Sequence, residues 1–115
     1  MEKEFILTNG ELKIPCKRSE PSYGTIRRVV LGVHGLGGST ADAIQEGIAE
    51  EMEMFRSASV RFDFPAHGES PMESDALTLD NCIETLIYTA QWAHNRYPDV
   101  DFCIFRNAYK LCRKR

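Results

Sequence analysis

The 115-residue sequence predicts an α/β protein with a mostly parallel β-sheet. Three observations support this fold class: a hairpin signal near the N-terminus, three apolar segments of strand length, and two amphipathic helical segments between those strands. Strands that alternate with helices are typical of βαβ units, whose crossovers are right-handed. The predicted order is therefore a β-hairpin followed by strand, helix, strand, helix and strand.

The hairpin is predicted from the dipeptide Asn9-Gly10, which separates the short apolar segments 5–7 and 12–14. Asn and Gly tolerate the positive φ angles that a tight primed turn requires. Residues 17–23 contain a proline and have no apolar period, so they are predicted to form a loop.

Three strands are predicted after the hairpin. Residues 25–33 contain a continuous apolar run, as expected for a strand that is covered on both faces. Residues 57–64 alternate in character, and the residues expected on one face are Val60, Phe62 and Phe64. Residues 100–105 are apolar enough for a further buried strand, which is expected to lie beside the strand 25–33.

The first helix is predicted after Ser39 or Thr40, either of which is suited to cap its N-terminus. Its buried face is predicted from apolar residues at helical spacing: Ile44, Ile48, Met52 and Phe55. Acidic residues repeat on the opposite face, which is expected to be a solvated surface and not a metal site: Asp42, Glu46, Glu50 and Glu53.

The second helix is predicted to begin after Thr78, a good N-cap, and to stop at Pro98. Its buried stripe is predicted to consist of six residues at helical spacing: Leu79, Ile83, Leu86, Ala90, Ala93 and Tyr97.

Composition limits the classes of protein that the chain can represent. Its 43% hydrophobic and 27% charged residues are typical of one soluble globular domain. No stretch approaches the roughly 20 apolar residues of a membrane span, and the charged N-terminus lacks an apolar signal core, so a cytoplasmic location is expected. No metal or other cofactor is expected. The cysteines lack metal-binding spacing and are expected to be reduced, mostly buried thiols: Cys16, Cys82, Cys103 and Cys112.

Charge is distributed unevenly along the chain, whose net charge is −3. Residues 1–105 hold all 17 acidic residues and 9 of the 14 basic ones, a balance of −8, whereas residues 106–115 carry the other 5 basic residues, a balance of +5. This tail is either a basic arm for nucleic acid or anionic lipid, or a segment that does not belong to the parent fold.

Two loops contain the residues with potential chemistry. The loop after the strand 25–33 reads His34-Gly35-Leu36-Gly37-Gly38-Ser39. The loop after the strand 57–64 begins within it and reads Asp63-Phe64-Pro65-Ala66-His67-Gly68-Glu69-Ser70. A glycine-rich turn that directly follows a strand exposes backbone N–H groups, which can stabilise a developing oxyanion. Alone, the glycine cluster is equally well explained as a tight strand-to-helix turn, but both loops together favour the oxyanion interpretation.

These two motifs resemble those of the α/β-hydrolase superfamily, in particular its small esterase, monoglyceride-lipase and serine-aminopeptidase branch. The resemblance covers residues 1 to about 105 and implies the N-terminal portion of an α/β-hydrolase fold. It implies that Leu36 offers its backbone N–H to an oxyanion hole and that His34, Gly35 and Gly37 shape this loop.

In the resembled family the second motif is structural. Its pattern is matched by Asp63, Gly68 and Ser70, while Ala66 stands where Gly is more common. His67 and Asp63 could be taken for a catalytic pair, but they share one short loop and no nucleophile is assigned beside them, so this interpretation is disfavoured.

The family's G-x-S-x-G nucleophile motif is expected directly after residues 100–105, where the chain has its basic tail instead. No Gly follows Gly68 and no Ser follows Ser74. The triad nucleophile, and the acid and His that follow it in the family, are therefore assigned to no residue of this chain. Residues 1–105 are predicted to form a partial hydrolase domain, and 106–115 a basic tail outside the family pattern.

The resulting functional prediction is a truncated serine hydrolase of the esterase, lipase or aminopeptidase type, which carries an oxyanion loop and is inactive alone. A frame slip, a premature stop or a cut gene model near Arg106 would explain the loss of pattern there. Small ester or amide substrates are implied for the intact family. The strand 100–105 is expected to be an exposed edge that promotes self-association.

Other functions fit the sequence less well. A dinucleotide-binding βαβ unit would need a third glycine at the position of Thr40, and a phosphate loop would need Gly-Lys-Ser/Thr. The alternative from another class is a small non-enzymatic interaction protein with a basic C-terminal tail. Nucleic acid is not an expected partner, because that tail offers Tyr109 as its sole aromatic residue for base stacking.

Overall fold

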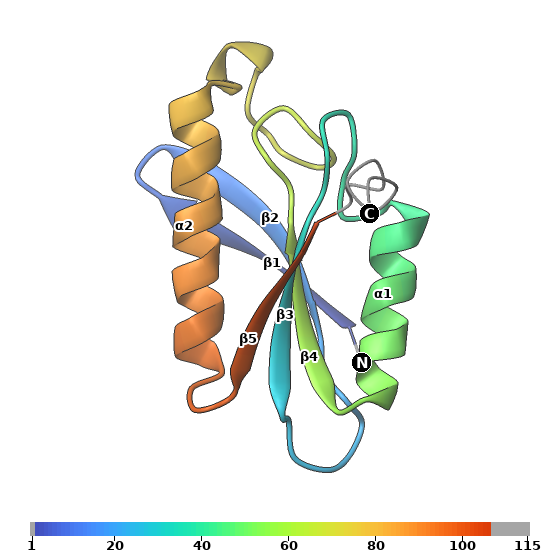
Figure 1. The fold of residues 1–115 in the computed structure, drawn as a ribbon. Coiled ribbons are helices and arrows are strands. Elements are labelled where there is room, and N and C mark those ends of the chain that lie inside the picture. The colour runs from blue at the N-terminus through green and yellow to red at the C-terminus, as the bar shows by residue number, and fades with distance from the viewer. Residues whose placement is uncertain (1, 107–115) are drawn as a thin grey trace, which may run out of the picture.

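A computed structural model describes residues 2–106 of the chain. It contains one twisted sheet with a helix on each face (Figure 1). The elements are, in chain order, β1 (Glu2–Asn9), β2 (Leu12–Ser19), β3 (Arg28–Val33), α1 (Ala43–Met54), β4 (Ser57–Phe62), a 3-10 turn (Ser74–Ala76), α2 (Leu79–Arg96) and β5 (Asp101–Arg106). The predicted order of hairpin, strand, helix, strand, helix and strand is confirmed.

The five strands are arranged in the order β1-β2-β4-β3-β5. The central strand β3 is parallel to both of its neighbours, so that Leu31 lies beside Val60 on one side and beside Ile104 on the other. Strand β2 is antiparallel to β1 and β4. The predicted mostly parallel sheet is thus a mixed one, parallel where β3 pairs with β4 and β5 and antiparallel at β1 and β2. The predicted position of the last strand beside the first βαβ strand is confirmed.

The hairpin turn differs from the prediction by one position. Asn9 pairs with Leu12, so the two-residue loop consists of Gly10 and Glu11. Of these two, only Gly10 has a positive φ, at 62°. Hairpin turns of type II′ require glycine at the first loop position, which explains why Gly10 occupies it and Asn9 remains in the strand.

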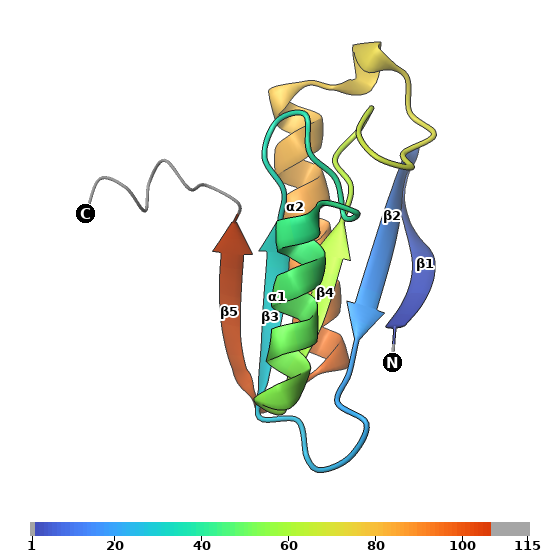
Figure 2. The same ribbon diagram turned by 90° about the vertical axis from the view of Figure 1, so that its right-hand side faces the viewer.

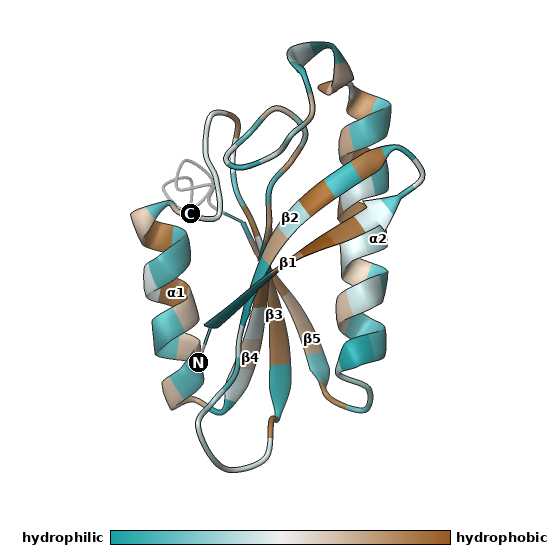
Figure 3. Cartoon of the chain, turned by 180° about the vertical axis from the view of Figure 1, so that it is seen from behind, coloured by the Kyte–Doolittle hydropathy of each residue, from teal (hydrophilic) through white to brown (hydrophobic). Residues whose placement is uncertain are grey.

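The two faces of the sheet have opposite character. The face under α2 holds the main apolar core, which includes Val29, Leu31, Ala58, Val60 and Phe62. Residues alternate between the faces of a strand, so the buried Ser57, Ser59 and Arg61 of β4 lie under α1. Figure 2 shows α1 and α2 on opposite sides of the sheet. In Figure 3 hydrophobic stretches concentrate on the strands, whereas both helices have mixed colours.

Strand β4 corrects the predicted strand 57–64 at its end. It stops at Phe62, so Phe64 lies in the following loop. All six residues of β4 are buried, so the strand is covered on both faces instead of one. Burial of Arg61 is possible because its Nε donates to the Thr40 carbonyl at 3.2 Å and its Nη2 lies 3.3 Å from the Glu2 carboxylate.

Helix α1 begins later than predicted, with Asp42 as its N-cap instead of Ser39 or Thr40. The backbone of Thr40 is engaged from both sides, because its N–H donates to Asp63 and its carbonyl accepts from Arg61. These bonds hold residue 40 in the loop and delay the helix.

The buried face of α1 was only partly predicted. Ile48 and Met52 are half-buried, whereas Ile44 and Phe55 are 51% and 61% exposed. Gln45 and Ala49 are the buried residues of this helix. A side chain on Gly32 would collide with the Gln45 side chain, so α1 approaches the sheet where a glycine leaves room for a polar residue.

Helix α2 has the predicted ends. Thr78 Oγ1 accepts the N–H of Asn81 at 3.1 Å, and the helix ends at Arg96, before Pro98. Its buried stripe differs from the prediction, because Leu79 and Ile83 are 75% and 45% exposed. The predicted Ala93 and Tyr97 are buried and the predicted Leu86 and Ala90 half-buried, while the neighbouring row contributes the buried Thr85 and Thr89. The Thr85 hydroxyl donates back to the Asn81 carbonyl at 2.7 Å, which satisfies it inside the core.

Two remaining expectations concern the end of the chain and the thiols. Strand β5 includes Arg106, the first residue of the predicted tail, and residues 107–115 lie outside the described part of the chain. Of the cysteines, Cys16 is buried, Cys82 half-buried and Cys103 exposed, all as free thiols, so the expectation of burial fails for Cys103. Cys112 lies outside the described residues.

Candidate functional site

The two predicted loops meet at one edge of the sheet. Strands β3 and β4 are parallel neighbours, with Val33 beside Phe62 at their C-terminal ends. The loops that leave these ends rise side by side above the sheet (Figure 1). The edge beyond the carboxyl ends of parallel strands is where α/β proteins generally place their binding sites.

His34 connects the first loop to the second. Its ring is buried, with Nδ1 at 2.7 Å from the carbonyl oxygen of Gly35 and Nε2 accepting the backbone N–H of Phe64 at 3.1 Å. Because Nε2 accepts a hydrogen bond, the proton of the neutral ring is on Nδ1. Burial lowers the pKa of His34, which favours this uncharged form.

His67 makes the reciprocal connection from the second loop. Its Nε2 accepts the backbone N–H of Gly37 at 2.9 Å, and its Nδ1 lies 3.0 Å from the carbonyl oxygen of Pro65. Because Nε2 of His67 accepts a hydrogen bond, the proton of the neutral His67 ring is on Nδ1. The rings of His34 and His67 lie 5.0 Å apart at an interplanar angle of 37°.

Asp63 also joins the two loops. Its buried carboxylate accepts the N–H of Thr40 at Oδ1, at 2.9 Å, and the N–H of Glu69 at Oδ2, at 3.1 Å. Gly68 has φ of 53°, and a Cβ there would collide with this carboxylate. Glycine is therefore needed at position 68 both for backbone conformation and for space.

Ser70 stabilises the second loop from within. Its Oγ accepts the N–H of Ala66 at 3.2 Å and that of Met72 at 3.1 Å. Ala66 has φ of 64°, a left-handed conformation that is unfavourable for a residue with a Cβ. In residues 2–106 no hydrogen bond links the Ser70 hydroxyl to a histidine ring, and both ring nitrogens of His67 are engaged by backbone groups.

The first loop presents Leu36 at its tip. The Leu36 side chain is 90% exposed. The turn is closed by the N–H of Gly38, which donates to the Gly35 carbonyl at 2.9 Å, and Gly37 has φ of 81°. Among the hydrogen bonds of the described chain, none engages the N–H of Leu36. That N–H is therefore available to bind an oxygen of a ligand.

The structure brings together all the residues named from the two motifs, and it adds contacts that the sequence did not predict. The bond between Gly37 and His67 and the bond between Thr40 and Asp63 were missed. The one available signal was an aspartate placed directly after a buried strand. The partners themselves became evident only from the arrangement of the two loops.

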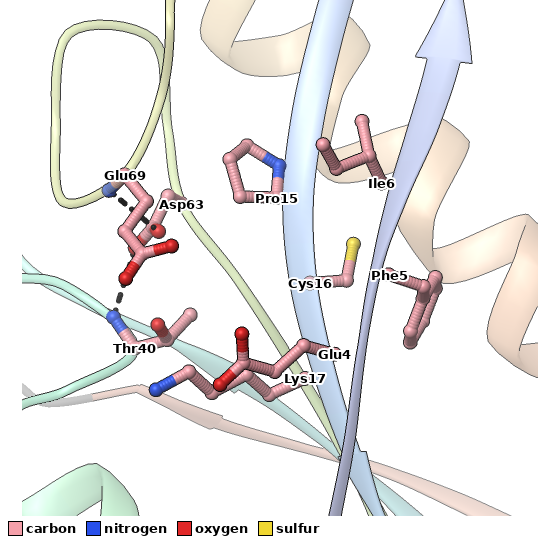
Figure 4. Close-up of a pocket in the computed structure, with 9 residues that line it drawn as sticks. All are labelled: Glu4, Phe5, Ile6, Pro15, Cys16, Lys17, Thr40, Asp63 and Glu69. Carbon is pink, nitrogen blue, oxygen red and sulfur yellow. Dashed lines mark hydrogen bonds between the residues drawn. The ribbon is translucent and has the colours of Figure 1, made fainter.

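A cavity of about 330 Å³ lies beside Asp63 and Thr40 and is distinct from the Leu36 loop. Figure 4 shows its mixed lining, in which Glu4 and Lys17 of the hairpin approach Thr40, Asp63 and Glu69 of the loops. The lining of this cavity therefore combines three acidic side chains with the ammonium group of Lys17.

Two features are absent from residues 2–106, a cluster of metal ligands and a membrane-spanning helix. His, Cys, Asp and Glu side chains there form no group of three or more with the arrangement of a metal site. Neither helix of that part is long and apolar enough to cross a membrane.

Solved structures resemble this fold, although no protein-family model and no curated protein matches the sequence. A serine hydrolase without a lid from Xanthomonas campestris superimposes with a TM-score of 0.78 at 17% identity, over 94% of this chain and 51% of that one. For a cold-adapted esterase from an Arctic intertidal metagenomic library the TM-score is 0.76 at 18% identity, over 91% and 49%. A serine hydrolase homologue from Coxiella burnetii gives 0.72 at 16% identity, over 93% and 52%. The chain spans about half the length of these proteins. It therefore has a partial α/β-hydrolase fold.

Proposed function

We propose that the loop from His34 to Gly38 supplies one half of the oxyanion hole of a serine ester hydrolase, with the Leu36 N–H as the donor. The observation that supports this most directly is the availability of that N–H at the C-terminal end of β3, in a turn whose Gly37 and Gly38 N–H groups are already engaged. A fixed donor that needs no reorganisation stabilises the charge that develops on a carbonyl oxygen during acyl transfer. Small esters or amides are the proposed substrates of the intact enzyme.

The other residues of the two motifs are assigned supporting roles. His34, Gly35 and Gly37 shape the loop from His34 to Gly38. Asp63 holds the second loop against it, and Gly68 and Ser70 stabilise the second loop from within. We assign the nucleophile, the acid and the catalytic histidine to no residue of this chain.

The 115-residue chain is accordingly expected to be inactive on its own. A fluorophosphonate probe, which labels activated serines, should leave it unmodified, because the Ser70 oxygen accepts two backbone N–H groups and is hydrogen-bonded to no histidine ring within residues 2–106. Stoichiometric labelling that is abolished by Ser70→Ala would identify Ser70 as a nucleophile and contradict this assignment.

The donor role is tested in a chimera that also contains the C-terminal half of a solved hydrolase. Residues 1–106 would be fused to the C-terminal remainder of the lidless Xanthomonas campestris hydrolase, and hydrolysis of short aryl esters measured. Leu36→Pro removes the N–H at a position whose φ is not positive, whereas Leu36→Ala retains it. In a folded and active chimera, we expect Leu36→Pro to lower kcat about 100-fold to 1000-fold and Leu36→Ala to leave it nearly unchanged. Equal activity of both variants would refute the proposal.

We also propose that the chain self-associates through β5. Within residues 2–106 this strand has one strand neighbour, β3, and Ile104 is 59% exposed on it. The Asp101 N–H donates toward β3, to the Arg27 carbonyl at 3.4 Å. By alternation, the backbone groups of Phe102, Ile104 and Arg106 point to the open side, where a second strand can pair with them.

A further inference from the structure

We infer that His34 and His67 are positioning residues, which hold the loop from His34 to Gly38 in place only while both rings are uncharged. Protonation of the rings would break both histidine bonds between the loops and release the turn that presents the Leu36 N–H, while the bond from Thr40 to Asp63 remains. This inference rests on the proposed function of the Leu36 N–H, but the contacts that support it are independent of any catalytic chemistry.

Each histidine binds its own loop through Nδ1 and the other loop through Nε2. His34 donates to Gly35 of its own loop and accepts from Phe64 of the second loop. His67 donates to Pro65 of its own loop and accepts from Gly37 of the first. The two histidine bonds that cross between the loops therefore both depend on an Nε2 lone pair, whereas the bond from the Thr40 N–H to Asp63 does not. Protonation of Nε2 uses that lone pair, so the new ring N–H faces the backbone N–H that it formerly accepted. The Nδ1–H of each ring can still donate to the carbonyl of its own loop.

The same contacts fix the direction of the Leu36 N–H. In a planar trans peptide, the N–H points opposite to the C=O of the preceding residue. The Gly35 carbonyl, which shares a peptide plane with the Leu36 N–H, accepts from the His34 ring at 2.7 Å and from the Gly38 N–H at 2.9 Å. The next peptide plane carries the Gly37 N–H, which the His67 ring holds at 2.9 Å. Both planes that flank Leu36 are thus held by a histidine.

The surroundings of the His34 ring oppose charge on balance. Burial is the main cause that lowers the pKa of His34, and proximity to His67 acts in the same direction, whereas the Gly35 carbonyl and the carboxylates of Asp63 and Asp42 act against it. The Asp63 carboxylate is already engaged by two backbone N–H groups, and the Phe64 ring packs edge-on against His34 at 5.0 Å. The rings lie only 5.0 Å apart, so a charge on His67 disfavours a proton on His34.

The experiment uses the full 115-residue chain labelled with ¹⁵N. Ring ¹⁵N shifts report the tautomer, and scalar couplings across the N–H···N bonds report the contacts of Gly37 with His67 and of Phe64 with His34. We expect both couplings at about pH 8 and their loss at about pH 5, together with at least a tenfold fall in the amide protection factors of Gly37 and Phe64. Protection factors correct for the intrinsic pH dependence of amide exchange.

Two variants separate a positioning role from a general loss of structure. In His67→Gln, the Gln Oε1 can accept the Gly37 N–H but does not titrate, so Gly37 protection should persist at about pH 5. His94→Gln, on the exposed side of α2, changes a histidine outside the loops and should respond to pH as the unmodified chain does.

Unchanged Gly37 protection between the two pH values in the unmodified chain would overturn the inference, even if a variant failed to fold. A His67→Gln chain that folds and responds to pH like the unmodified one would also overturn it. If the couplings behave as expected but the Leu36→Pro chimera keeps its activity, the proposed function fails and the histidine contacts stand.

Discussion

The backbone N–H of Thr40 donates to the carboxylate of Asp63 at 2.9 Å, although the two residues are 23 positions apart in the chain. Both residues are buried, and the second Asp63 oxygen accepts the N–H of Glu69. One carboxylate therefore ties the loop before α1 to the loop that follows β4. Hydrogen bonds to a buried charged acceptor are stronger than those between neutral groups, so this contact should contribute substantially to stability.

Asp63→Asn should destabilise the fold by about 2 to 3 kcal/mol, because the amide can accept one backbone N–H but presents its own N–H to the other. Urea denaturation followed by circular dichroism measures the change. Asp80→Asn, an exposed aspartate in the first turn of α2, is the matched control and should cost at most about 1 kcal/mol. Equal losses in the two variants would show that the Asp63 contacts do not carry the stability assigned to them.

Gly68→Ala should be destabilising by about 1 kcal/mol or more, since the new Cβ meets the Asp63 carboxylate and φ is 53°. Gly47→Ala is the control, because we expect it to raise the stability that Gly68→Ala lowers. Position 47 lies inside α1 with no atom within 4 Å of an added Cβ, so alanine should stabilise that helix by up to about 1 kcal/mol. Thermal unfolding of both variants tests the pair, and the expectation fails if both shift Tm in the same direction.

Acid should destabilise the chain through His34. Its folded-state pKa is lowered, so below the unfolded-state value of about 6.5 the unfolded chain binds more protons than the folded one. The stabilisation is fully present above that pH and is lost as pH falls below it. Urea midpoints between about pH 8 and about pH 5 should decline less steeply in His34→Gln than in the unmodified chain. A parallel decline would exclude His34 as the cause.

Thiol labelling should separate the cysteines by burial. Burial raises the pKa of Cys16 to about 12, which leaves almost no thiolate at neutral pH, whereas Cys103 is exposed on β5. Iodoacetamide at about pH 8 should modify Cys103 readily and Cys16 only after unfolding, as peptide mass mapping would reveal. Fast modification of Cys16 in the folded chain would mean that β2 is not packed against the core as described.

Self-association should depend on one edge of the sheet. The edge strand β1 carries Glu2, Lys3 and Glu4, and charges of this kind discourage strand addition, whereas β5 exposes Ile104 between apolar residues. Ile104→Lys should shift the chain toward monomer in size-exclusion chromatography over a dilution series. Ile6→Lys alters an equally exposed isoleucine on β1 and should leave the association unchanged. Association that survives Ile104→Lys would rule out the β5 edge as the interface.

The sequence by itself determined the element order and the position of the two loops, because these depend on local signals. Gly10 specified the hairpin, Thr78 and Pro98 bounded α2, and the apolar runs marked β3 and β5. Parallel strands joined by right-handed crossovers then place the loops after β3 and β4 at one edge, so the neighbourhood of the candidate site followed from topology.

Only the tertiary structure decided which helical rows are buried and how the loops are joined. Ile44, Leu79 and Ile83 are apolar and correctly spaced, yet a neighbouring row faces the sheet in each helix, with Gln45 and Ala49 buried in α1 and Thr85, Thr89 and Ala93 in α2. The reciprocal histidine bonds depend on the distance between two loops whose residues are about 30 positions apart in the chain. No local pattern encodes that distance, since it is set by the packing of β3 beside β4 and by the conformation of both turns.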